Sequence, residues 1–148
     1  MRIENRLQLQ LWREECKEKH QKEKCRILVC GGTGCLAGGS DKIYARFKEM
    51  SEGMDHVTVK IGEEIAHPGV KMSGCHGFCE MGPLVRIEPY NYLYLKVKLE
   101  DCEEIFEKTI LRGEPVERLM YHDDHKVYET QEEIPFYAEQ TRLVLKNC

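Results

Sequence analysis

The chain has 148 residues, of which 41% are hydrophobic, and a formal net charge of −4 at pH 7. A chain of this size buries enough apolar surface for one core, so we expect one principal domain with appendages. Because charges of both signs are interspersed, the composition argues against a nucleic-acid partner or an anionic membrane surface. The sequence shows neither a signal peptide nor an apolar run that spans a bilayer, so we expect a cytoplasmic protein with no direct membrane insertion.

Residues 1–24 predict a charged amino-terminal helix. Ile3, Leu7 and Leu11 recur at intervals of four, which places them on one helical face. The following run, "CRILVC" at 25–30, is short, continuous and apolar, and it ends in glycines. That pattern is typical of a buried strand.

The segment after this strand predicts a helix and a second strand. Ser40 is expected to cap a helix that ends near Gly53. Residues 56–61, "HVTVKI", alternate in polarity and predict a strand that pairs in parallel with the first one. The glycine- and proline-marked stretch "GEEIAHPGVKMSG", at 62–74, is expected to be a loop.

A hairpin and a last helix complete the predicted domain. "PLVRIEP" (83–89) and "LYLKV" (93–97) read as two antiparallel strands joined by a turn. Asp101 is expected to cap the last helix, which Gly113 and Pro115 end. Its apolar face repeats at helical spacing through Cys102, Ile105, Phe106, Thr109 and Ile110.

The predicted order of elements sets the fold class. A β-α-β unit followed by β-β-α is the order of a thioredoxin-like fold, so we expect an α/β protein with a mixed sheet of about four strands. We divide the chain into a helix at 1–24, a principal domain at 25–122 and a polar linker or arm at 123–148. The first helix and the arm are the expected docking elements.

Two cysteine pairs lie in glycine-rich loops beside predicted strand ends. Cys30 and Cys35 enclose "GGTG", and Cys75 and Cys79 enclose "HGF". Loops at one edge of a sheet can converge, and four converging thiolates are typical of a metal site. We therefore expect these four cysteines to form one site.

The spacing within the two pairs favours a [2Fe–2S] cluster over zinc. Structural zinc sites usually place two residues between paired cysteines, whereas the gaps here are four and three. A [2Fe–2S] cluster is larger than one ion and takes two cysteines on each iron, so wider loops suit it. The glycines leave space for backbone N–H groups to face the sulfides. A zinc-stapled interaction module with no redox role is the alternative.

Three other kinds of site are disfavoured. A thioredoxin-type redox site needs C-x-x-C, which does not occur. A Rieske centre needs two histidine ligands, and His76 has no partner at a matching spacing, so we expect it to be a hydrogen-bonding loop residue. No phosphate-cradling loop precedes a helix, which argues against an NAD-binding site in this chain.

The remaining candidate residues have simpler interpretations. Cys16 and Cys102 lie on apolar helix faces, which predicts burial. A role for Cys25 as a cluster ligand is a minor alternative, and Cys148 is expected to be an exposed thiol. The stretch "HDDH" at 122–125 contains hard-metal ligands, but in a polar segment it favours a solvated loop.

The motifs together resemble a known family. "CGGTGCLAGGS", "SGCHGFCEMGPLVRIEPYNYLY" and "GEPVERLMY" resemble the amino-terminal thioredoxin-like [2Fe–2S] domain of flavoprotein subunits in NAD-linked electron-transfer complexes. The likeness is greatest to the beta subunit of electron-bifurcating [FeFe]-hydrogenases and related formate dehydrogenase subunits, which are kin of the NADH-binding subunit of respiratory complex I. It covers roughly residues 25–122. The resemblance implies that the cluster ligands are Cys30, Cys35, Cys75 and Cys79.

The resemblance also implies a function. It indicates a one-electron carrier, not catalytic on its own, whose partners are an FMN/NADH-binding flavoprotein subunit or domain and other iron–sulfur subunits. Residues 133–148 resemble the lead-in to the FMN- and NADH-binding domain, but that domain's flavin loop and [4Fe–4S] cysteines are absent. We therefore expect either a fragment or a short relative whose catalytic part is on another chain.

Overall fold

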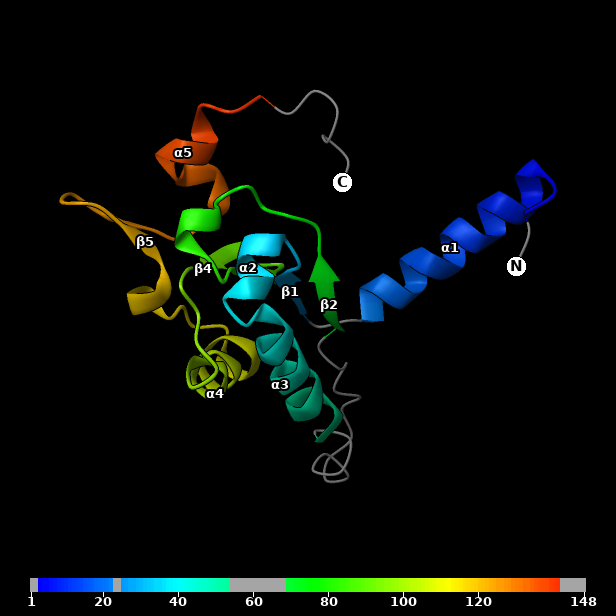
Figure 1. Ribbon diagram of the computed structural model, residues 1–148. Helices are drawn as coiled ribbons and strands as arrows, with labels where there is room; N and C mark the ends of the chain where they lie inside the picture. The colour runs from blue at the N-terminus through cyan, green and yellow to red at the C-terminus, as the bar shows by residue number, and fades with distance from the viewer. Residues whose placement is uncertain (1–2, 23–24, 54–68, 142–148) are drawn as a thin grey trace.

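A mixed four-stranded sheet forms the centre of the molecule. The computed structural model describes residues 3–22, 25–53 and 69–141 (Figure 1). The strand order is β2-β1-β3-β4, with β1 and β2 parallel and the other two pairs antiparallel. The strands are β1 (Arg26–Cys30), β2 (Gly69–Ser73), β3 (Val85–Glu88) and β4 (Tyr92–Tyr94). The α/β class, the four-stranded mixed sheet and the β3–β4 hairpin are confirmed.

Helices pack on one face of this sheet. The segments α3 (Ser40–Gly53), α4 (Asp101–Ile105) and its π-helical continuation η3 (Phe106–Leu111) supply the covering side chains. Ile27 and Val29 alternate with less buried neighbours along β1, so they face this layer together. Phe47 and Ile105 pack against them, and all four side chains are completely or almost completely buried. The predicted apolar face of the last helix is therefore confirmed.

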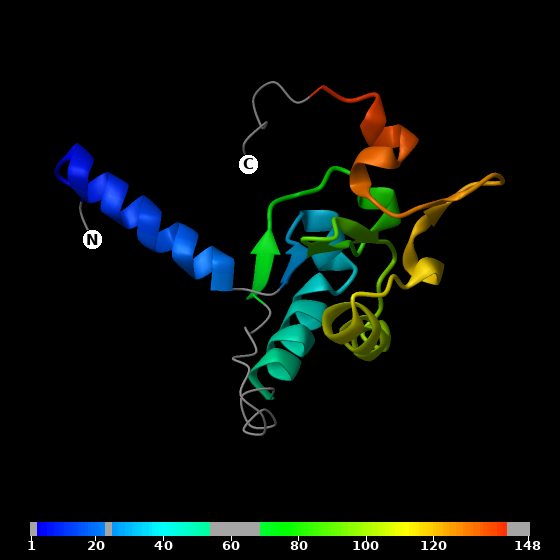
Figure 2. The same cartoon turned by 180° about the vertical axis from the view of Figure 1, so that it is seen from behind.

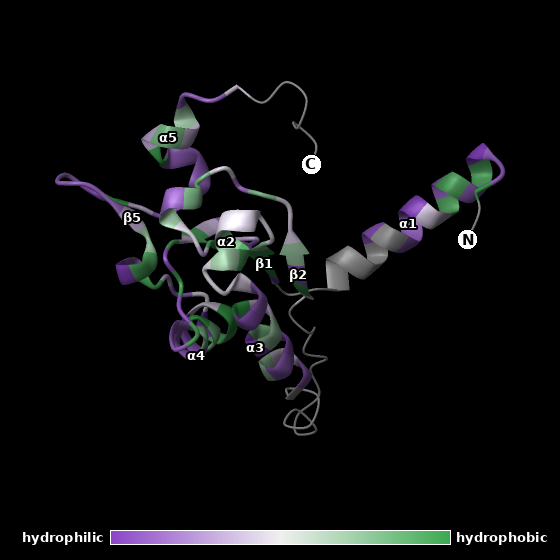
Figure 3. Cartoon of the chain, viewed as in Figure 1, coloured by the Kyte–Doolittle hydropathy of each residue, from purple (hydrophilic) through white to green (hydrophobic). Residues whose placement is uncertain are grey.

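The first helix extends away from the sheet. Helix α1 (Arg6–Lys22) projects from the body of the molecule in both views (Figures 1 and 2). Its apolar residues are largely exposed, Leu7 at 65% and Trp12 at 46%. Figure 3 shows green, hydrophobic positions along the part of α1 farthest from the sheet. Nothing in the described part of the chain covers them.

None of the described helices is long and apolar enough to cross a membrane.

The partner strand of β1 lies in the segment expected to be a loop. Residues 69–73 form β2 and pair in parallel with β1, from Arg26 opposite Gly69 to Cys30 opposite Ser73. The loop expectation is therefore wrong for these residues, because the pairing with β1 overrides their weak strand pattern. The predicted strand at 56–61 lies outside the described residues.

Ser40 does not cap its helix. It is the first residue of α3 and is buried, and its hydroxyl has no hydrogen-bond partner. The carbonyl of Gly39 accepts the first helical bonds, from the amides of Lys42 and Ile43. Because Gly39 occupies the capping position, Ser40 is already the first helical residue and cannot cap the helix.

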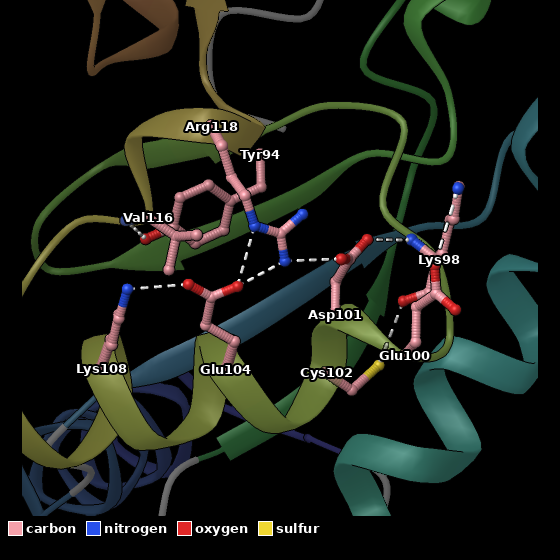
Figure 4. Close-up of polar contacts among 9 residues, drawn as sticks. All are labelled: Tyr94, Lys98, Glu100, Asp101, Cys102, Glu104, Lys108, Val116 and Arg118. Carbon is pink, nitrogen blue, oxygen red and sulfur yellow. Dashed lines mark hydrogen bonds and ion pairs between the residues drawn. The ribbon is translucent and has the colours of Figure 1, made fainter.

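Asp101 also differs from its predicted role. It is the first residue of α4, and its Oδ2 accepts a hydrogen bond from the backbone N–H of Lys98, three residues earlier, at 2.8 Å. Its other oxygen accepts from Arg118, 2.7 Å away, which also pairs with Glu104 (Figure 4). Asp101 therefore fixes the chain that enters the helix and ties it to the turn η4 (Glu117–Leu119).

The polar carboxyl-terminal segment returns to the sheet. It forms a hairpin of β5 (Tyr121–His122) and β6 (Val127–Tyr128), then the turn η5 (Gln131–Glu133) and the short helix α5 (Pro135–Ala138). The N–H of Leu93 in β4 donates to the carbonyl of Glu129 at 3.1 Å. This bond attaches the segment to the edge of the sheet beside β4.

Candidate metal centre

The first cysteine pair is buried at the carboxyl end of β1. Cys30 is the last residue of the strand, and Cys35 lies in the short helix α2 (Thr33–Ala37), with 1% exposure for each. The N–H of Cys30 donates to the carbonyl of Leu84 at 3.0 Å, and the N–H of Gly31 donates to the carbonyl of Ser73 at the same distance. The first loop is therefore anchored to the strands on both sides.

The second pair lies in the loop that leaves the neighbouring strand. Cys75 follows β2, and Cys79 begins the turn η2 (Cys79–Met81); both are exposed. Gly77 has φ of +82°, which favours glycine, and its N–H donates to Cys75 Sγ at 3.3 Å. Because β1 and β2 are parallel, both cysteine loops emerge at the same edge of the sheet.

The two loops converge as predicted. A Cβ built on Gly32 would lie 2.9 Å from Cys75 Sγ and 3.5 Å from Cys30 Sγ. A Cβ on Gly34 would lie 3.3 Å from Cys79 Cβ. Backbone from the first loop therefore contacts the cysteines of the second, and only glycine leaves room for this approach.

The thiols interact mainly as two pairs. Burial, a hydrogen bond with Cys30 and the charges of Cys30 and Cys79 raise the pKa of Cys35 to about 11. A hydrogen bond with Cys75, followed by its charge, raises the pKa of Cys79. Thiols held this close keep their protons unless a cation displaces them, and metal binding would release those protons.

This pairing fits a two-iron group better than one ion. A zinc ion needs four ligands around one point, at about 2.3 Å for sulfur. A [2Fe–2S] cluster instead takes one pair of thiolates on each iron. Soft donors in two pairs, with glycine backbone between them, therefore suit the cluster.

The other candidate residues lie apart from this group or have other partners. His76 contacts Ser73 Oγ through Nε2, at 2.8 Å, and Gln131 Oε1 through Nδ1, at 3.3 Å, as expected for a hydrogen-bonding loop residue. Cys25 is buried at the opposite end of β1, about 16 Å of strand from the site. Cys102 is buried in the larger core, as predicted.

Two further expectations meet different outcomes. The side chain of Cys16, and all of Cys148, lie outside the described residues. In the 122–125 stretch, Asp123 accepts hydrogen bonds from the Tyr128 hydroxyl and from the amides of His125 and Lys126, which lowers its pKa to about 2. These bonds make Asp123 the centre of an exposed turn, which agrees with the loop interpretation.

Sequence reasoning missed one part of the site's surroundings. The cysteines of the first pair share a hydrophobic cluster with side chains from the carboxyl-terminal segment. The buried residues of that segment recur at intervals of three, which was the available signal: Tyr128, Gln131, Ile134 and Tyr137. The signal is weak because three of the four carry polar groups, so the segment reads as solvated.

Comparison with known proteins agrees with this geometry. The family model described as thioredoxin-like [2Fe–2S] ferredoxin matches residues 17–109. A 2Fe–2S ferredoxin of Aquifex aeolicus (strain VF5) is 50% identical over 86 residues, which are 58% of this chain and 71% of that protein. A 2Fe–2S ferredoxin of Clostridium pasteurianum is 32% identical over 98 residues, 65% of this chain and 94% of that protein.

Solved structures give the same result for the fold. A thioredoxin-like [2Fe–2S] ferredoxin from Aquifex aeolicus aligns with a TM-score of 0.54 and 31% identity, over 66% of this chain and 89% of that chain. The wild-type protein, solved at 1.5 Å, aligns with a TM-score of 0.53 and 30% identity, over 68% and 99%. The predicted thioredoxin-like fold is therefore confirmed.

Proposed function

Because this chain belongs to the thioredoxin-like [2Fe–2S] ferredoxin family, we propose that its cluster is held by Cys30, Cys35, Cys75 and Cys79. Membership establishes the cofactor and electron transfer as the activity, and it removes the zinc alternative. When bound, a cluster of this type takes up and releases one electron at a time. The ligand set and the partners are what we propose.

One observation carries the ligand proposal. Gly32 approaches Cys75 so closely that a methyl group would clash with Cys75 Sγ, 2.9 Å from its position, and would also touch Cys30 Sγ at 3.5 Å. This approach joins the two cysteine loops into one site. Cys25 lies at the far end of β1 and Cys102 on helix α4, both away from this approach.

The two pairs differ in exposure, and this indicates the side of the site at which electrons enter and leave. Cys30 and Cys35 are buried, whereas Cys75 and Cys79 are exposed. A partner protein that docks over the second loop would therefore come closest to the bound group. The N–H of Gly77 donates to Cys75 Sγ on this side, and such bonds to sulfur help to set the reduction potential.

We further place the carrier in an NAD(P)-linked oxidoreductase of the cytoplasm, as a subunit or module of a hydrogenase, a formate dehydrogenase or a complex I-like flavoprotein. Its partners would be an FMN/NADH-binding subunit or domain and other iron–sulfur subunits. The support is the motif resemblance over roughly residues 25–122 and again at 133–148. The relatives named above are described as ferredoxins, so this finer assignment depends on those motifs.

Metal analysis tests the proposed cluster, and a reduction assay tests the proposed flavoprotein partner. We expect about two irons and two acid-labile sulfides in each reconstituted full-length chain. Dithionite should reduce this protein and NADH alone should not, because NADH gives up two electrons as a hydride and a flavin is needed to pass them on singly. Adding an FMN-containing, NADH-oxidising subunit of the hydrogenase or complex I type should restore reduction by NADH.

The outcomes distinguish the cluster assignment from the partner assignment. A colourless chain that binds one zinc and no sulfide would overturn the cluster as the group that the four cysteines hold. Fast reduction by NADH with no flavin present would overturn the dependence on a flavoprotein partner, and so would failure of every such flavoprotein to support reduction. The cluster assignment would survive either of the last two results.

A further inference from the structure

The carboxyl-terminal segment binds directly to the exposed cysteine loop. The hydroxyl of Tyr137 donates a hydrogen bond to the main-chain carbonyl of His76 at 2.9 Å. His76 lies between Cys75 and Cys79, 61 positions earlier in the chain. This contact therefore fixes the backbone of the loop from outside, through a residue beyond the part that the family model matches, 17–109.

A second contact holds the side of the same loop. The ring of His76 lies between Ser73 Oγ and Gln131 Oε1, at 2.8 Å and 3.3 Å. Gln131 is only 3% exposed, and Arg86 Nη1 of strand β3 donates to the same oxygen at 3.3 Å. The side-chain amide of Gln131 is therefore buried and connects the loop to the sheet through His76 and Arg86. Buried polar groups with such partners tend to hold one arrangement.

A third contact is aromatic. Phe136 stacks on Phe78, the residue before Cys79, with ring centroids 4.4 Å apart and an interplanar angle of 9°. Tyr137 meets the same ring edge-on at 5.6 Å. Phe136 remains 43% exposed, so it covers Phe78 while it faces solvent on its other side. Aromatic pairs of this kind contribute beyond the area that they bury.

From these contacts we propose that residues 131–137, the clamp segment, position the Cys75–Cys79 loop and shield Phe78, the residue before Cys79, from water. The inference rests on the proposed ligand role of Cys75 and Cys79. Gly74 and Gly77 give the loop backbone freedom, and both of its cysteines are exposed, so contacts from outside the loop help to hold its backbone in one arrangement. Positioning by neighbouring groups sets ligand geometry and tunes the potential of a metal group.

The test compares variants of the full-length chain by hydrogen exchange and by potentiometry. In Tyr137→Phe, the amides of Gly77, Met81 and Gly82 should exchange about fivefold faster, the factor expected for one lost hydrogen bond. In Phe136→Ala, the reduction potential should become more positive, because water stabilises the added negative charge of the reduced form. Phe136→Tyr keeps the stack and should retain the wild-type potential.

A matched control lies in the same segment of the chain. Tyr128→Phe also removes one tyrosine hydroxyl, but that hydroxyl donates to Asp123 within the β5–β6 hairpin and not to the loop. It should leave both the loop exchange and the potential unchanged. Equal acceleration in Tyr128→Phe, no acceleration in Tyr137→Phe, or equal potentials in Phe136→Ala and Phe136→Tyr would each overturn the clamp.

The exchange measurement needs no cluster, so the two proposals fail separately. A wild-type chain that loads no iron and sulfide would overturn the ligand assignment, while the exchange rates would still decide whether residues 131–137 hold the loop. Conversely, a loaded chain with unchanged exchange in Tyr137→Phe would leave the ligand assignment intact and remove the clamp.

Discussion

Gly82 lies directly against Cys35: a Cβ at position 82 would come within 2.8 Å of Cys35 Sγ. The backbone at Gly82 has φ of −74° and ψ of 163°, a conformation that any residue adopts. The glycine is therefore needed for space and not for its conformational freedom. The chain after η2 passes so close to a buried cysteine that no side chain fits between them.

This relationship predicts the effect of a methyl group. Gly82→Ala should displace Cys35 Sγ and lower the iron and sulfide content of the protein, and Gly32→Ala should do the same through Cys75. Gly74→Ala is the matched control, because a Cβ there would meet nothing within 4 Å. Iron and sulfide assays with visible absorption spectra measure the outcome. Equal loss in the Gly74 variant would mean that the loops do not tolerate any added bulk.

Serine substitutions test the ligand set. Replacing any one of the four proposed ligands should bleach or destabilise the cluster, because a hydroxyl is a harder and less acidic donor than a thiol. Cys102→Ser should keep the visible spectrum, since Cys102 is buried in the other core cluster. Absorption and EPR spectra of the five variants decide the matter. A bleached Cys102 variant beside an intact Cys79 variant would contradict the assignment.

Tyr94→Phe should destabilise the domain. The hydroxyl of Tyr94 is buried; it donates to Thr109 Oγ1 at 2.6 Å and accepts from the N–H of Val116 at 3.2 Å. Removing it leaves that N–H without a partner, so unfolding free energy should fall by about 1–3 kcal/mol. Tyr90→Phe, at an exposed tyrosine, should change stability by less than about 0.5 kcal/mol. Urea unfolding measures both, and similar losses would contradict the buried bond.

Stability should also fall at alkaline pH through Cys102. Burial raises the pKa of its thiol from 9.0 to about 12, so the unfolded chain loses this proton at lower pH than the folded one. The protonated thiol therefore favours the folded state below pH 9, and that contribution is lost as pH rises from about 9 to about 12. Urea unfolding of wild type and Cys102→Ala should give free energies that converge over this range. A constant difference would argue against the raised pKa.

Local sequence pattern was sufficient for the strand and loop that carry the first cysteine pair. The short continuous apolar run "CRILVC" at 25–30, followed at once by glycines, is a property of adjacent residues. It was insufficient for β2, where Gly69 and Lys71 interrupt any regular pattern. That stretch is a strand because β1 supplies its hydrogen-bonding partner, and a pairing between distant segments leaves little trace in either one.

The surroundings of the site were harder to predict than its ligands. Cysteines at short spacing among glycines have few alternative uses, so their convergence could be expected. Gln131 and Tyr137 are polar residues in a polar segment, and their burial follows from contacts with a loop more than 50 positions away. Their composition predicted that these side chains would be exposed to solvent, whereas tertiary contacts place them against the cysteine loop.

The isolated position of α1 gives the protein a separate optical signal. Its Trp12 is the single tryptophan of the chain, and it lies on a helix that projects from the sheet rather than in either core cluster. Intrinsic fluorescence excited at the indole band therefore reports on the surroundings of this helix. A protein that covers α1 would shift the emission to shorter wavelength, while visible absorption would follow reduction. Docking at α1 and electron uptake can thus be followed separately in one sample, the first by tryptophan fluorescence and the second by visible absorption.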